Sequence, residues 1–121
     1  GNDNNWNTII DMKTYIVDGQ EINVYPLKFW WVGKSFRGIT LNGKIYRRDW
    51  ETASERGVRH EQIHALQQKE LGNFLFYLKY IYYWIVRFGY YKIPFEKEAY
   101  ANQMTPNYLN IRERNAWKQY K

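Results

Sequence analysis

Two short turn signals constrain this fold more than any other part of the sequence. Asp18-Gly19 and Asn42-Gly43 each separate short runs of β-branched and aromatic residues, and such dipeptides are typical of hairpins with a primed two-residue turn. The flanking strands are expected at residues 15–17, 22–25, 38–41 and 44–47. The aromatic-rich run Lys28–Val32 predicts a further strand. We therefore expect a small, mostly antiparallel sheet within residues 14–47.

After Asp49 the hydrophobic pattern becomes helical. Thr52 and Glu55 have the spacing of a capping box, which predicts a helix from about there to a stop at Gly72. Two more helices are expected, over Phe74–Phe88 and from Pro94 to about Gln103. Strands followed by helices is the order of an α+β fold. We expect one domain over residues 1–121, with residues 1–7 disordered and the helices that carry chemistry within 52–105.

The composition narrows the possible functions. The chain has 121 residues and no cysteine, which excludes disulfides, cysteine nucleophiles and thiolate metal ligands. The formal net charge of +6 comes from basic residues that are spread along the chain. We interpret them as a solvated basic surface and expect no nucleic-acid partner.

Two aromatic segments each leave two interpretations open. Phe74–Phe88 is apolar except for Lys79 and Arg87 and is shorter than the roughly 20 residues of a membrane span. We expect a core helix packed against the preceding one, and the alternative is a helix that associates with a membrane surface. The other aromatic group either lines a cleft or forms one face of the sheet; it consists of Phe29, Trp30, Trp31 and Phe36.

Both histidines of the chain lie in the motif His60-Glu61-x-x-His64 on a predicted helix. Residues at i and i+4 share one helical face, so both imidazoles can reach one tetrahedral metal ion. Glu61 lies on the flank of that face, where it can reach a metal-bound water. Without a third histidine or a cysteine, the third ligand should be a carboxylate. The helix that follows offers Glu96 and Glu98, and spacing alone does not choose between them.

This arrangement resembles the gluzincin metallopeptidases. Their third zinc ligand is a glutamate on a later helix, and Glu96-x-Glu98-Ala99-Tyr100 is similar to the Glu-x-Glu-Ala-Asp segment of the membrane-associated gluzincins. The resemblance covers about Val58–Gln103 and implies that Glu96 binds the metal. Tyr100 stands where the family has an aspartate that supports a ligand histidine.

The resemblance implies a zinc metallopeptidase that acts on peptide or protein substrates, with Glu61 as general base. The strand Gly38–Leu41 would present its edge to an extended substrate. An oxyanion donor would have to come from Tyr100, Tyr108 or Arg112, because no spare histidine exists. Two alternatives remain: a zinc-binding domain with little or no activity that serves as a sensor or interaction module, and a basic, aromatic membrane-surface module. Gln67 and Gln68 extend the histidine face and can accept hydrogen bonds from ligand imidazoles.

Overall fold

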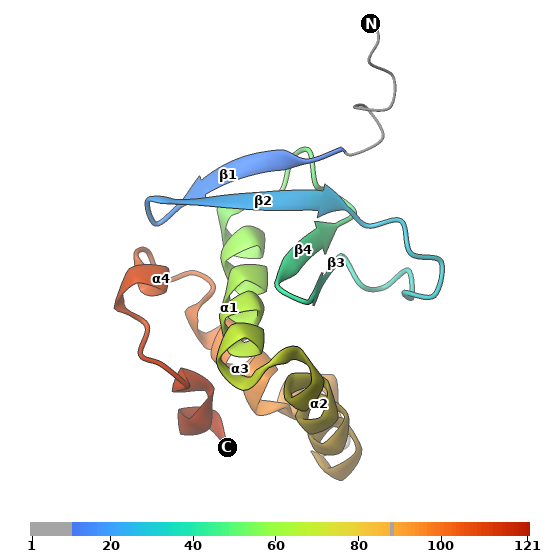
Figure 1. The fold of residues 1–121 in the computed structure, drawn as a ribbon, viewed down its shortest axis with the longest axis vertical. Helices are drawn as coiled ribbons and strands as arrows, with labels where there is room; N and C mark the ends of the chain where they lie inside the picture. Colours follow the sequence, from blue (N-terminus) through green and yellow to red (C-terminus); the bar gives the residue numbers. More distant parts are fainter. Residues whose placement is uncertain (1–10, 88) are drawn as a thin grey trace, which may run out of the picture.

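A four-stranded sheet precedes a set of helices in this chain, which confirms the α+β expectation (Figure 1). The computed structural model describes residues 11–87 and 89–121, so the end expected to be disordered lies outside the described residues. The strands are β1 (Lys13–Val17), β2 (Gln20–Pro26), β3 (Gly38–Leu41) and β4 (Lys44–Arg47). Their order in the sheet is β1-β2-β4-β3, with β1–β2 and β3–β4 antiparallel and β2–β4 parallel. The sheet is therefore mostly antiparallel, and β3 forms one edge.

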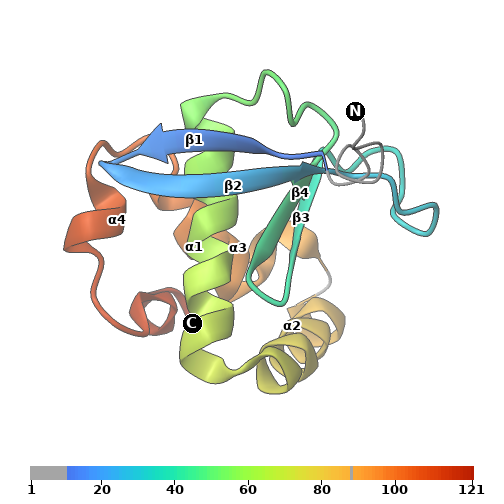
Figure 2. The ribbon, with the colours of Figure 1, turned by 45° about the horizontal axis from the view of Figure 1, so that its top comes forward.

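Both predicted hairpin turns are confirmed. Asp18 and Gly19 have φ angles of 54° and 76°, and Asn42 and Gly43 have φ angles of 52° and 80°. Positive φ at both central residues defines the primed turn whose twist matches that of the flanking strands. The second turn places the β3–β4 hairpin directly beside the histidine-bearing helix (Figure 2).

The strand predicted at Lys28–Val32 is wrong, because this segment forms turns. The Val32 N–H donates to the Phe29 carbonyl at 3.3 Å. The Arg48 guanidinium then binds the Val32 and Gly33 carbonyls at 3.1 and 3.0 Å. Backbone groups that a strand would offer to a neighbour are satisfied locally by turns and by this side chain.

The helices begin and end close to the predicted positions. They are α1 (Glu55–Leu71), α2 (Asn73–Arg87), α3 (Pro94–Asn102) and α4 (Tyr108–Ile111), with short 3-10 turns η2 (Tyr90–Lys92) and η3 (Ala116–Tyr120). The predicted Thr52 cap is wrong: Ser54 is the N-cap of α1, and its hydroxyl accepts from the Gly57 N–H at 3.0 Å. Gly72, with φ of 86°, follows the last residue of α1 as predicted.

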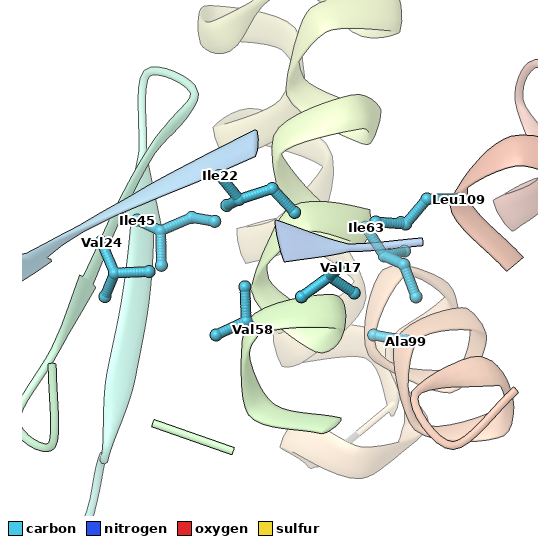
Figure 3. Close-up of a cluster of buried hydrophobic side chains, with 8 residues drawn as sticks. All are labelled: Val17, Ile22, Val24, Ile45, Val58, Ile63, Ala99 and Leu109. Carbon is cyan, nitrogen blue, oxygen red and sulfur yellow. The ribbon is translucent and has the colours of Figure 1, made fainter. Parts of the chain in front are cut away.

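The main core lies between the sheet, α1 and the two helices behind it (Figure 3). It contains Val17, Ile22, Val24 and Ile45 from the strands, Val58 and Ile63 from α1, Ala99 from α3 and Leu109 from α4. Helix α1 also buries an unusual number of polar side chains, including Arg59, Gln67 and Gln68. Since buried polar groups require partners, α1 is the element around which a polar site is built.

The prediction that the apolar helix is core is wrong for most of its circumference. Among the described side chains of α2, only Phe76 is buried, and its ring packs on Phe95 with centroids 4.6 Å apart. Figures 1 and 2 show α2 turning away from the lower end of α1, so one side of the helix has no cover. None of the described helices has the length and apolarity needed to cross a bilayer.

Candidate metal centre

Three predicted ligands converge at one buried point between α1 and α3. His60 and His64 lie one turn apart on α1, and Glu96 lies in the first turn of α3. The Glu96 Oε1 atom is 3.1 Å from His60 Nε2 and 3.0 Å from His64 Nε2. One ligand atom from each residue lies within 4.8 Å of the others, and all three side chains are buried. The group could therefore hold a metal ion.

The start of α3 positions Glu96 in the sequence. Pro94 occupies the first turn, where a proline fits because its missing N–H has no helical partner. Ile93 and Phe95 on either side are fully buried in a second apolar cluster with Phe76 and Trp117. These anchors fix the entry of the helix, so the intervening carboxylate is directed toward the histidines.

Gln67 fixes the ring orientation of His64. Its amide nitrogen donates to the Phe95 carbonyl and to Glu98 Oε1, both at 3.0 Å. Both partners are acceptors, so the remaining amide atom, Oε1, must be the oxygen that faces His64 Nδ1 at 2.8 Å. His64 Nδ1 is thereby the protonated nitrogen, and Nε2 points to the centre.

Gln103 supports His60 in the same way. Its Oε1 atom lies 2.8 Å from His60 Nδ1, and its backbone carbonyl accepts from Arg59 Nη1 at 2.9 Å. Gln103 lies two helical turns after Glu96 and on the same face of α3. It provides the histidine support that the resemblance implied for position 100, where Tyr100 stands.

The centre favours a positive charge. With Nδ1 protonated on both rings, each neutral imidazole directs its Nε2 lone pair at the Glu96 carboxylate. Burial lowers the pKa of His64, but the Glu96 carboxylate outweighs this effect and the pKa rises to about 9. Burial raises the pKa of Glu96, but the two imidazoles hold it well below its ordinary value. A proton or a metal cation between these three atoms relieves the repulsion of their lone pairs.

Glu98, the other carboxylate that spacing left open, is not part of this group. It is fully buried and accepts from Arg112 Nε at 2.6 Å and from the Tyr108 hydroxyl at 2.7 Å. Arg112 also binds Glu70 at 2.7 Å. Glu98 thus joins the C-terminal segment to Gln67 and supports His64 from a distance. Tyr108 and Arg112, two of the three candidate oxyanion donors, are engaged in this network.

Glu61 lies beside the centre and is held by the β3–β4 hairpin. Its Oε1 accepts from the Thr40 hydroxyl at 2.9 Å, and its Oε2 is 3.7 Å from the Arg47 guanidinium. A Cβ atom at Gly38 would lie 2.9 Å from Oε2, so a glycine is needed there. The Glu61 charge contributes to the raised pKa of His64, which indicates that the carboxylate is near the ring.

Two tyrosines contact the ligand residues. The Tyr80 hydroxyl, from α2, donates to Glu96 Oε2 at 2.8 Å, and burial together with this carboxylate raises the pKa of Tyr80. The Tyr100 ring, from α3, packs edge-on against His60 with centroids 4.6 Å apart. Sequence reasoning missed Tyr80, because nothing in the pattern of α2 shows which of its tyrosines faces the centre.

Two cavities open on either side of the centre. An apolar cavity of about 490 Å³ is lined by Glu61, His64 and Glu96 and by side chains of β3 and α2. A polar cavity of about 610 Å³ is lined by His60, Glu61 and Tyr100 and by three arginines, Arg37, Arg47 and Arg56. Glu61 borders both, so the centre lies where an extended ligand could pass from one cavity to the other.

Comparisons with models of known protein families, with characterised proteins and with solved structures find no match for this chain. What the centre can do therefore follows from its own donor set. Two imidazoles and one carboxylate, each held by further hydrogen bonds, form a set that suits zinc and that leaves a fourth position for water or substrate.

Proposed function

We propose that the protein is a zinc metallopeptidase of the gluzincin type, in which His60, His64 and Glu96 hold the ion. One observation carries the proposal: the three ligand atoms converge with their lone pairs directed at one point, and Gln67 and Gln103 fix the tautomer of each histidine. Orienting partners of this kind are usual around metal-binding histidines.

The residues beside the centre suit hydrolysis. A bound zinc ion supplies a Lewis acid that polarises a carbonyl and acidifies a water molecule. Glu61 takes the proton of the attacking water and passes it to the leaving amine. Thr40 and Arg47 hold the Glu61 carboxylate in place for both transfers. Tyr100, beside His60 in the polar cavity, is the oxyanion donor in this proposal.

The edge of β3 suits an extended substrate. The two-residue turn makes Leu41 and Lys44 the hydrogen-bonded pair, so the backbone groups of Gly38 and Thr40 point away from β4. The Thr40 carbonyl accordingly accepts from Gln68 Nε2 at 2.7 Å. A peptide that adds to this edge would lie along the apolar cavity, past Glu61.

Metal analysis and a peptide-library digest test the proposal together. We expect about one zinc per chain after purification without chelator, and loss of the metal in the double variant His60→Ala/His64→Ala. Glu61→Gln should keep the zinc and lower hydrolysis by about 10²–10⁴-fold. Full zinc occupancy in the double variant would overturn the assignment. Stoichiometric zinc without cleavage of any library member would instead support a sensor or interaction module.

A further inference from the structure

Helix α2 is turned so that its most apolar face points outward. Its inner side carries Phe76 and three partly buried tyrosines, Tyr77, Tyr80 and Tyr83. The outer side carries exposed large apolar residues: Phe74, Leu75, Leu78, Ile81, Tyr82 and Ile85. Phe74 is 76% exposed and Ile85 61%. A helix bathed only in water normally has the opposite arrangement. The outer face of α2 therefore suits an apolar environment.

A second exposed aromatic group lies in the connection from β2 to β3. Trp30 is 92% exposed and Trp31 54%. Trp31 and Phe36 line the apolar cavity together with Ile81 and Trp84 of α2, so the two groups border the same opening. Figures 1 and 2 both show α2 and this connection on the side of the molecule opposite α4. We call the two groups together the aromatic rim.

The sequence around the aromatic rim has positive charge only. There is no acidic residue between Glu70 and Glu96, and none between Glu21 and Asp49. The first interval contains three basic residues and the second contains six: Lys79, Arg87 and Lys92, then Lys28, Lys34, Arg37, Lys44, Arg47 and Arg48. Most of the surplus of +6 is thus concentrated in the two segments that carry the exposed aromatics.

We propose that the aromatic rim docks on an anionic lipid bilayer. Tryptophan and tyrosine are the side chains that prefer the boundary between headgroups and acyl chains, and basic residues are attracted to anionic headgroups. At about 1.5 Å per residue, the 15 residues of α2 span roughly 22 Å, which fits a helix lying in the plane of the surface. A second copy of the chain is a poorer partner, because its rim would bring the same positive charge.

The docked orientation has a consequence for the cavity, and this step rests on the proposed function. Trp31 and Trp84 border both the rim and the apolar cavity that leads to Glu61. The cavity mouth would then face the lipid surface, and the substrates would be peptide segments that lie on or emerge from the membrane.

Vesicle flotation with the full chain tests the docking. We expect co-flotation with vesicles of phosphatidylcholine and phosphatidylglycerol, weak binding to phosphatidylcholine alone, and weakening at high salt. Leu78→Ser/Ile85→Ser should lower the partition coefficient about tenfold or more. Lys34→Gln and Lys92→Gln should each lower it about 5-fold. The emission of tryptophan should shift to the blue on binding, and Trp30→Phe should reduce this shift.

Matched controls carry equal changes on exposed side chains elsewhere. Ile16→Ser and Ile111→Ser remove exposed isoleucines from β1 and α4, and Lys69→Gln and Lys118→Gln remove exposed charges outside the rim; all should bind as the parent does. His60→Ala/His64→Ala should also still bind, which separates docking from the proposed metal chemistry. Failure to float with anionic vesicles, or equal loss in the controls, would overturn the proposal. So would a dimer in sedimentation velocity that Leu78→Ser/Ile85→Ser dissolves while flotation is absent.

Discussion

The Tyr80 hydroxyl donates a 2.8 Å hydrogen bond to Glu96 Oε2, while both histidines approach the other oxygen, Oε1. One carboxylate thus has one oxygen for a metal ion and one held by a phenol from a different helix. The bond connects α2, whose outer face is exposed, to the centre.

Replacing this phenol should loosen the ligand without unfolding the protein. We expect Tyr80→Phe to weaken zinc binding by about 10-fold or more, because outer hydrogen bonds to metal ligands contribute at that level. Competition with a chromophoric chelator measures the effect. Tyr77→Phe is the matched control, since its hydroxyl lies on the same helix but bonds to Asn42. Equal losses in the two variants would mean that α2 packing, not the bond to Glu96, sets the affinity.

The two glutamines that hold the histidines should also matter for metal affinity. Gln67→Ala and Gln103→Ala should each lower zinc affinity about 10–100-fold, because the ring orientation and tautomer are no longer fixed. Gln68→Ala is the control: its amide bonds the Thr40 carbonyl and the Gly43 N–H, which connects α1 to the hairpin. That variant should lose thermal stability and keep its zinc affinity. Unchanged affinity in both Gln67→Ala and Gln103→Ala would contradict the orienting role.

The sequence predicts the local parts of this molecule well. Both hairpin turns follow from Asp18-Gly19 and Asn42-Gly43, where residues tolerant of positive φ stand at both central positions. The histidine pair follows from helical periodicity, and Glu96 follows from the family resemblance rather than from spacing. Such features depend on the backbone geometry of a few neighbouring residues.

The failures concern tertiary contacts. The aromatic run at Lys28–Val32 has strand-forming side chains, but Arg48, sixteen residues beyond Val32, binds its carbonyl and holds a turn. The apolar helix looked like core, yet its cover depends on where Gly72 directs the chain. Tyr80 and Gln103 reach the centre from α2 and the end of α3, and neither position is marked by a motif.

A methyl group at Gly38 should test how Glu61 is positioned. The Cβ of Gly38→Ala would meet Glu61 Oε2 at 2.9 Å and the Tyr46 carbonyl at 3.1 Å. We expect normal zinc content and a reduction of about 10-fold or more in any hydrolysis, since small displacements of a general base are costly. Gly33→Ala is the control, because its Cβ would make only ordinary contact, 3.6 Å from Phe36. Equal activity in the two variants would remove Glu61 from the proposed mechanism.

The two carboxylates of α3 should separate metal binding from stability. Glu96→Gln should abolish stoichiometric zinc and leave the fold intact. Glu98→Gln should keep the zinc in the folded protein but destabilise it by about 3–5 kcal/mol, because it removes the buried partner of Arg112. Urea unfolding and metal analysis of the same preparations check both results. Zinc loss in Glu98→Gln alone would exchange the two assignments.

A buried ion pair far from the centre should give the protein a defined loss of stability in acid. The Asp18 carboxylate accepts from Arg59 Nη2 at 2.8 Å and from the Asn107 and Leu109 N–H groups, so it joins the first hairpin to α1 and the C-terminal segment. Chiefly through the Arg59 hydrogen bonds, the pKa of Asp18 falls to about 2, below its ordinary value of 3.8.

A pKa that is lower in the folded state means that the carboxylate stabilises the fold when ionised. The contribution is fully present above about pH 4, where the unfolded chain also has an ionised Asp18, and it is lost as the pH falls through about 2. Asp18→Asn should therefore reduce the free energy of unfolding by about 3 kcal/mol at pH 7, because Arg59 remains buried without its counter-charge. The difference between parent and variant should shrink below pH 4. Urea titrations from pH 2.5 to 7 measure it, with Glu21→Gln, an exposed carboxylate on β2, as the control. A difference that stays constant over this range would show that packing rather than ionisation of Asp18 accounts for the loss.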